Sequence, residues 1–91
     1  MKYELIKTDI SAERTVMQDI VEIIDEVETV TGQEETNEYD VTITMALHPT
    51  DGIGADFSKD IIVRSNNSQT GFQVDIERAQ AIEAFIDNIN A

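Results

Sequence analysis

The chain has 91 residues, enough for one domain and too few for two, so we expect a single domain spanning residues 1–91. Nineteen Asp and Glu residues face six Lys and Arg, and the formal net charge of −13 disfavours direct binding to nucleic acid or to anionic membranes. The absence of cysteine excludes disulfides, thiolate metal sites and a cysteine nucleophile.

The amino-terminal segment points to a protein without a membrane partner. Residues 1–7 lack the apolar run of a signal peptide, and no stretch of the sequence approaches the ~18 apolar residues that span a bilayer. We therefore expect a cytoplasmic location. In residues 1–7, Tyr3 and Leu5 alternate with polar residues as in a short edge strand. The alternative is that this segment is helical and leads into the next helix.

A helix is predicted over residues 11–31. Ser11 suits the N-cap, and Gly32 suits the position just after a helix C-terminus. Between them the apolar residues recur at the helical period, as Val16, Ile20, Ile23, Ile24, Val27 and Val30. If this stripe is buried, Ile24→Ala should cost about 2–5 kcal/mol.

Three strands and a second helix are predicted to follow. Residues 39–48 alternate between apolar and polar with period two, which indicates a strand with one buried face. Residues 59–64 and 72–74 are predicted to pair as a hairpin around the polar turn 65–71. Asp75 is predicted to cap a final helix that runs nearly to the last residue.

These elements predict an α+β fold of order (β)αβββα, with a three-stranded antiparallel sheet and two helices packed on one of its faces. Each element has one apolar side to bury, and that requirement favours the two-layer arrangement. The predicted core consists of Val16, Ile20, Ile23, Ile24, Val27, Val41, Ile43, Met45, Ile61, Val63, Phe72, Val74, Ile82, Phe85 and Ile86.

Signals for catalysis or metal binding are weak. His48 is the only histidine, so neither a nucleophile–base pair nor a nitrogen-rich metal site can be assembled. Gly52 and Gly54 form a G-x-G that lacks the third glycine of a dinucleotide-binding loop. Asp51 and the acids that follow it lack the spacing of an EF-hand. We expect no enzymatic activity, no cofactor and no bound metal.

The negative charge is concentrated in the first half of the sequence. No Lys or Arg occurs between Thr15 and Phe57, while eleven of the nineteen acids lie in that interval. On the predicted helix, Asp19, Glu22 and Glu26 would follow one another at about 4.5 and 6 Å along the axis. The rise between phosphates on one DNA strand is about 3.4 Å, so the carboxylate row is similar in scale to a phosphate row. The candidate binding residues are Asp19, Glu22, Asp25, Glu26, Glu28, Glu34, Glu35, Glu38 and Asp40.

Two functions fit this charge pattern. In the first, the protein mimics nucleic acid and blocks the positively charged site of a basic nucleic-acid-binding protein. In the second, the acids form an ordinary solvated face on a small interaction or structural module, such as a virion or regulatory component. Replacing Glu22, Asp25 and Glu26 by Lys distinguishes the two, because only the first function predicts that this change abolishes binding.

Local patterns near the C-terminus suggest one family. Residues 60–67 read DIIVRSNN, residues 71–74 read GFQV and residues 82–86 read IEAFI. Together with the predicted αβββα order and the strong negative charge, they resemble the phage-encoded type II anti-CRISPR proteins. This resemblance implies an inhibitor of Cas9, in which acids of the second hairpin and of a third helix mimic the PAM duplex. Here the predicted turn 65–71 has no carboxylate, so the acids of such an inhibitor would have moved to the predicted helix and the loop after it.

Overall fold

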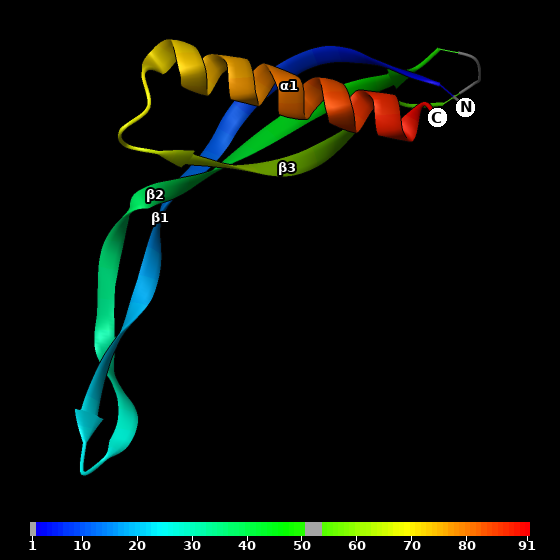
Figure 1. Cartoon of the computed structure of the whole chain (residues 1–91). Helices are drawn as coiled ribbons and strands as arrows, with labels where there is room; N and C mark the ends of the chain where they lie inside the picture. The colour runs from blue at the N-terminus through cyan, green and yellow to red at the C-terminus, as the bar shows by residue number, and fades with distance from the viewer. Residues whose placement is uncertain (1, 51–53) are drawn as a thin grey trace.

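The computed structural model describes residues 2–50 and 54–91, which form three strands and one helix (Figure 1). Strand β1 spans Tyr3–Ile24, β2 spans Val27–Pro49 and β3 spans Phe57–Asn66, and helix α1 spans Gly71–Ile89. The strands form one antiparallel sheet in the order β1-β2-β3. The predicted fold class, with two helices on one face and the order (β)αβββα, is therefore wrong, because the observed order is βββα.

The predicted helix over residues 11–31 is instead a β-hairpin formed by β1 and the start of β2. More than half of residues 15–31 are Val, Ile or Thr, whose branched side chains are restricted in a helix and fit the pleated surface of a strand. Asp25 and Glu26 form the turn, with φ values of 51° and 67°. Positive φ at both central residues matches the twist of a two-residue hairpin, and this turn stops β1 where the helical pattern would continue.

The predictions for residues 39–48 and 59–64 are confirmed as strands, which lie within β2 and β3. Val41 pairs with Val63 and Ile43 pairs with Ile61 across the two strands. The ambiguity at residues 1–7 is resolved in favour of a strand, because β1 begins at Tyr3.

Helix α1 begins earlier than predicted, and residues 72–74 are its first turn rather than a third strand. Thr70, not Asp75, is the N-cap: its hydroxyl accepts the Gln73 backbone N–H at 3.2 Å. The Gln73 side chain in turn accepts the Thr70 backbone N–H at 3.0 Å, which completes a capping box. The hairpin predicted around residues 65–71 is thus wrong, since this segment is a turn between β3 and the helix.

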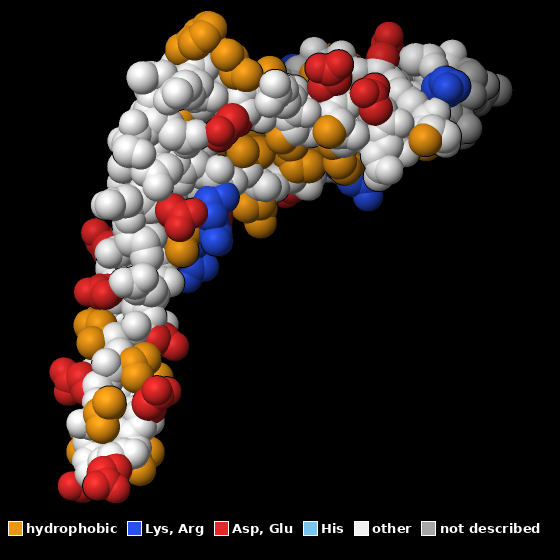
Figure 2. Space-filling view, in the orientation of Figure 1, with side chains coloured by type: hydrophobic (Ala, Val, Ile, Leu, Met, Phe, Trp, Pro, Cys, Tyr) orange, Lys and Arg blue, Asp and Glu red, His pale blue; other side chains and the backbone are white. Residues whose placement is uncertain are grey.

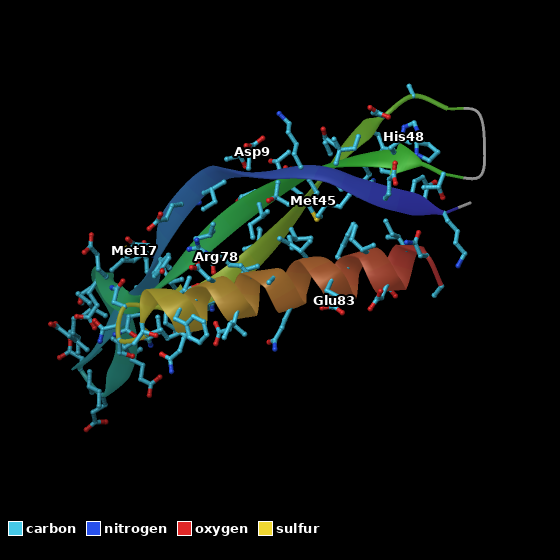
Figure 3. The ribbon with its side chains drawn as sticks, turned by 90° about the horizontal axis from the view of Figure 1, so that it is seen from above. Asp9, Met17, Met45, His48, Arg78 and Glu83 are labelled. Atoms are coloured by element: carbon cyan, nitrogen blue, oxygen red, sulfur yellow. The ribbon has the colours of Figure 1, made fainter. Side chains whose placement is uncertain are left out.

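The core lies between α1 and the face of the sheet formed by alternate residues of β2. Val41, Ile43, Met45 and Leu47 are buried. Ile82 and Phe85 of the helix pack against the cluster formed by the first three. Figure 3 shows Met45 between the sheet and α1, whereas Asp9 and Glu83 lie on the outer sides. Val74 is also buried, and the helix rests on both β3 and β1.

The predicted core residues of the first half are mostly exposed. Ile23 is 76% exposed, and Ile24 and Val27 are exposed as well, while Val16 and Ile20 are half-buried. The physical reason is that a two-stranded ribbon has no layer packed over it. Phe72 is 75% exposed because it lies on the side of the first helical turn that faces away from the sheet.

The two ends of the described chain are joined by Asn90. Its side-chain carbonyl accepts the Tyr3 backbone N–H at 2.8 Å, and its amide donates to the Tyr3 carbonyl oxygen at 3.0 Å. The Tyr3 ring meets Phe57 edge to face, with centroids 5.0 Å apart. These contacts bring the end of α1 to the start of β1, as Figure 1 shows by the closeness of the N and C labels.

A pair of alanine variants tests where the core lies. Met45→Ala should lower the free energy of unfolding by about 2–5 kcal/mol, because Met45 is fully buried. Ile24→Ala should lower it by less than about 1 kcal/mol, because Ile24 is 47% exposed at the tip of the hairpin. Urea titration of both variants measures the difference. Equal losses would place the hairpin tip in the core and contradict this fold.

Candidate functional site

The hairpin of β1 and β2 extends well beyond the third strand. The pairing of β2 with β3 ends at Glu38 and Asn66, and from there β1 and β2 continue as a two-stranded ribbon. We call residues 17–35 the arm. Eight residues of β1 lie in it, which at about 3.3 Å per residue corresponds to about 25 Å. Figure 1 shows the arm running away from the sheet and helix, in a molecule whose longest dimension is 64 Å.

The arm joins the rest of the described structure, residues 2–13, 41–50 and 54–91, which we call the body, at a bend held by specific hydrogen bonds. We call this bend, residues 14–16 and 36–40, the elbow. On β1, one residue lies between Thr15 and Met17. On β2, three residues lie between the two residues that pair with them, so the register of the two strands shifts here. The Thr36 hydroxyl donates to the Val16 carbonyl oxygen at 2.8 Å and accepts the Glu38 N–H at 3.2 Å. Such an irregularity bends a strand and changes its direction.

The elbow is also tied to the end of β3. The Asn37 carbonyl oxygen accepts the Asn67 backbone N–H at 2.8 Å. The base of the arm therefore has backbone contacts to the turn between β3 and α1, and this contact adds to the hydrogen bonds of Thr36 in fixing its direction.

Seven of the nine predicted binding residues lie on the arm, and all seven are exposed. They are Asp19, Glu22, Asp25, Glu26, Glu28, Glu34 and Glu35. Figure 2 shows acidic side chains along the arm down to its tip, with hydrophobic ones between them. The predicted row along one helix face does not exist, because neighbouring residues of a strand point to opposite faces. Residues on the same face of one strand repeat at about 6.6–6.8 Å, close to two phosphate rises of about 3.4 Å.

Two amides of the arm hold carboxylates in place across the ribbon. Gln18 donates to Glu34 at 2.6 Å, and Gln33 donates to Asp19 at 3.2 Å. No ion pair among the described residues joins a carboxylate of the arm to a Lys or Arg. The arm is thus a projecting element whose negative charges are oriented but not neutralised within the described structure.

The remaining two predicted site residues, Glu38 and Asp40, are half-buried at the elbow. Arg64 binds Asp40 through two bonds, from Nε at 2.9 Å and from Nη2 at 3.1 Å. These hydrogen bonds, with the guanidinium charge, hold the pKa of Asp40 below its usual range. Asp40 is therefore engaged within the chain, unlike the carboxylates of the arm.

Sequence reasoning missed a second arginine beside this pair. Arg14 on β1 is the register partner of Asp40, whose other neighbour is Arg64 on β3. Figure 2 shows basic side chains on the inner side of the bend. A cavity of about 280 Å³ opens there, lined by Arg14, Thr15, Val16, Met17, Gln33 and Asp40. Two arginines thus flank Asp40 at the base of the arm, whereas the arm itself has no Lys or Arg, and only the strand pairing reveals this placement.

The chemistry of the other candidate residues is limited. The His48 Nδ1 atom hydrogen-bonds to Asp56, at the end of β2 remote from the arm. Asp51 and Gly52 lie outside the described residues. Within residues 2–50 and 54–91, no group of three His, Cys, Asp or Glu side chains is arranged to hold a metal ion. In the same residues, no helix is long and apolar enough to cross a membrane.

Comparisons with protein-family models, with curated protein sequences and with solved structures find no match for this chain.

The Asp40–Arg64 pair predicts a specific pH dependence. Because the folded pKa of Asp40 is lowered, the pair stabilises the fold above the unfolded value near pH 3.9 and loses this effect as pH falls through the folded value. Asp40→Asn should therefore be less stable than the parent at pH 6, and the difference should shrink toward pH 3. Urea titrations across this range measure it, and a difference independent of pH would contradict the pairing.

The elbow predicts a directional role for Thr36. Thr36→Val removes the hydroxyl bond to Val16, worth about 1 kcal/mol locally, and should broaden the distribution of arm directions. The chain has no cysteine, so spin labels can be attached specifically at Glu26→Cys in the arm and Asp87→Cys in α1. Double electron–electron resonance then measures the distribution of distances between the two labels.

Thr29→Val is the matched control, because the Thr29 hydroxyl donates to the Val27 carbonyl oxygen, two residues away on the same strand and remote from the elbow. It should leave the distance distribution unchanged. If Thr36→Val also leaves the distribution unchanged, the elbow does not depend on this hydroxyl.

Proposed function

We propose that this protein is a non-enzymatic binding protein that inserts its acidic arm into the positively charged nucleic-acid site of a nucleic-acid-handling protein and blocks it. A nuclease such as Cas9 is the form of partner that the local C-terminal resemblance suggests. The protein would then act in the cytoplasm, that of the host cell if it is encoded by a phage. The observation that carries the proposal is the projecting arm, with seven exposed carboxylates and no Lys or Arg.

Charge complementarity supports this type of partner. A concentrated negative field repels nucleic acid and attracts a cleft lined by Lys and Arg, and it accelerates association with such a cleft. A carboxylate that meets a desolvated Arg or Lys through a hydrogen bond contributes about 1.5–3 kcal/mol, whereas an exposed ion pair contributes about 0–1 kcal/mol. Affinity would thus come from the carboxylates that enter the partner's cleft.

The shape of the arm supports the same conclusion. A two-stranded hairpin without a packed layer is marginally stable in water, and the arm exposes several apolar side chains. Large exposed apolar surface on a small protein is typical of interaction sites. A partner that covers the arm would supply the missing layer, while the sheet and α1 remain as the folded base.

The alternative function is a small interaction or structural module whose acids are only solvated. Charged side chains on a protein surface are ordinarily solvated, so the alternative makes a distinct prediction: the acids of the arm could be reversed without effect on binding. The proposed function requires the opposite result.

Charge reversal at the tip of the arm tests the proposal. The triple variant Glu22→Lys, Asp25→Lys and Glu26→Lys should weaken partner binding at least about 100-fold, since about 1.4 kcal/mol corresponds to tenfold. All three residues are exposed, so the body should keep its stability. The matched control reverses Asp75, Glu83 and Asp87 on the exposed side of α1 and changes the net charge equally. It should bind within about threefold of the parent.

The measurement uses the three immobilised proteins to capture partners from a host lysate at low and moderate salt. The captured protein is then purified, and its binding to nucleic acid is measured with and without each variant. A basic nucleic-acid-binding protein that the parent inhibits and the arm variant does not would support the proposal. Equal inhibition by the parent and the arm variant would show that the acids are only solvated.

A further inference from the structure

One face of the arm carries a group of aliphatic side chains along β1 and β2, interrupted by one carboxylate. Met17, Val21 and Ile23 alternate along one side of β1, and Val30 of β2 is directly opposite Val21. We call these four residues the stripe, and each is between 43% and 76% exposed. The four side chains form an unusual amount of apolar surface for a ribbon that nothing covers in this structure.

Carboxylates lie beside the stripe on the same face. Glu28 is opposite Ile23, and Glu35 is opposite Met17. Asp19 lies between Met17 and Val21, and the bond from Gln33 shows that its side chain is on this face. The face therefore combines an apolar centre with flanking negative charges.

The opposite face of the arm is organised differently. Ile24 and Val27 form a cross-strand pair next to the turn, and Ile20 lies over Gly32, which has no side chain. Gln18 and Glu34 bond to each other on this face. The Ile24–Val27 pair is thus a counterpart to the Val21–Val30 pair, because both are aliphatic cross-strand pairs of the arm and they lie on opposite faces.

A second copy of this chain does not fit the stripe. Joining two such faces would bring the carboxylates of both copies together, in a protein whose net charge is already −13. Like charges directly opposite each other on strands are destabilising. The occupant of this face must instead be basic around an apolar or aromatic centre.

Grooves that bind single-stranded nucleic acid have this composition. They combine Lys and Arg along the path of the phosphates with aromatic side chains on which bases stack. We infer that the arm occupies a single-strand groove: the stripe covers the aromatic platforms, and the flanking carboxylates meet the phosphate-binding cations. This inference rests on the proposed function and names the class of partner site.

The width of the arm favours a single-strand groove over a duplex site. Opposite residues of a two-stranded ribbon have Cα atoms about 4.5–5.5 Å apart. The two backbones of a DNA duplex are separated by grooves about 6 and 12 Å wide, so the carboxylates of one ribbon face lie too close together to replace both phosphate rows. One phosphate row with its bases is a better match.

Two double threonine variants separate the contributions of the two faces. Val21→Thr with Val30→Thr makes the stripe polar, while Ile24→Thr with Val27→Thr does the same on the opposite face. Threonine is β-branched and uncharged, so both variants should keep the hairpin and its electrostatics. Amide hydrogen exchange of arm residues checks that the hairpin persists.

Competition with two defined probes tests the inference. The first is an OB-fold single-strand DNA-binding protein loaded with a fluorescein-labelled oligo-dT strand, and the second is a basic duplex-binding protein loaded with a labelled duplex. Fluorescence anisotropy measures displacement of the nucleic acid. We expect the parent to displace oligo-dT, the Val21/Val30 variant to need at least about tenfold more protein, and the Ile24/Val27 variant to stay within about threefold.

The other outcomes contradict distinct statements. Displacement of the duplex alone would overturn the inference and leave the proposed function standing. Equal effects of the two threonine pairs, or no effect of either, would show that the stripe is not the contact surface. Displacement of neither nucleic acid would contradict the inference and the proposed function together.

Discussion

The pairing of β2 with β3 stops at Glu38 and Asn66, and the division of this molecule into a body and an arm depends on that limit. On one side of it, β2 has a strand on each edge and a helix over one face, so its apolar residues from Val41 to Leu47 are buried. On the other side, β2 has one neighbour and no helix above it. The same strand is thus a core element in one half and an exposed ribbon in the other.

This division separates stability from binding. The body holds the buried aliphatic residues, the capped helix and the Asn90 contacts to Tyr3. The arm holds most of the uncompensated carboxylates and the exposed stripe. Because mutual repulsion of these carboxylates would disfavour a compact structure, carrying them away from the core on a ribbon limits their cost to the fold.

The elbow marks the boundary between two electrostatic environments. Arg14 and Arg64 lie on either side of Asp40 across the three strands, whereas no basic residue occurs in the arm. Thr36 fixes the bend through the Val16 carbonyl and the Glu38 amide. A paired hairpin held at its base loses less conformational freedom on binding than a free loop would, which suits insertion into a groove.

The secondary structure of some segments could be predicted from the sequence, and that of others could not. Residues 39–48 were predictable because apolar and polar residues alternate strictly there, and the β-strand is the regular structure that buries every second side chain. Residues 11–31 were not, because their aliphatic residues fit a helical stripe as well as two faces of a ribbon. The dense Val, Ile and Thr content was the signal for strands, and periodicity outweighed it. At residues 70–74, the Thr70–Gln73 capping box was the missed sign of a helix start.

The sequence by itself determined the concentration of acids and the absence of Lys and Arg from residues 15–57, and it named nine candidate binding residues, seven of which lie on one exposed element of the structure. Only the tertiary structure decided that this element is a hairpin, that Asp40 is bound by Arg64 and that the valines 21 and 30 face each other. The physical reason is that charge is a property of residue type. Which side chains meet, and which stay exposed, depends on where β3 ends and on what α1 can cover.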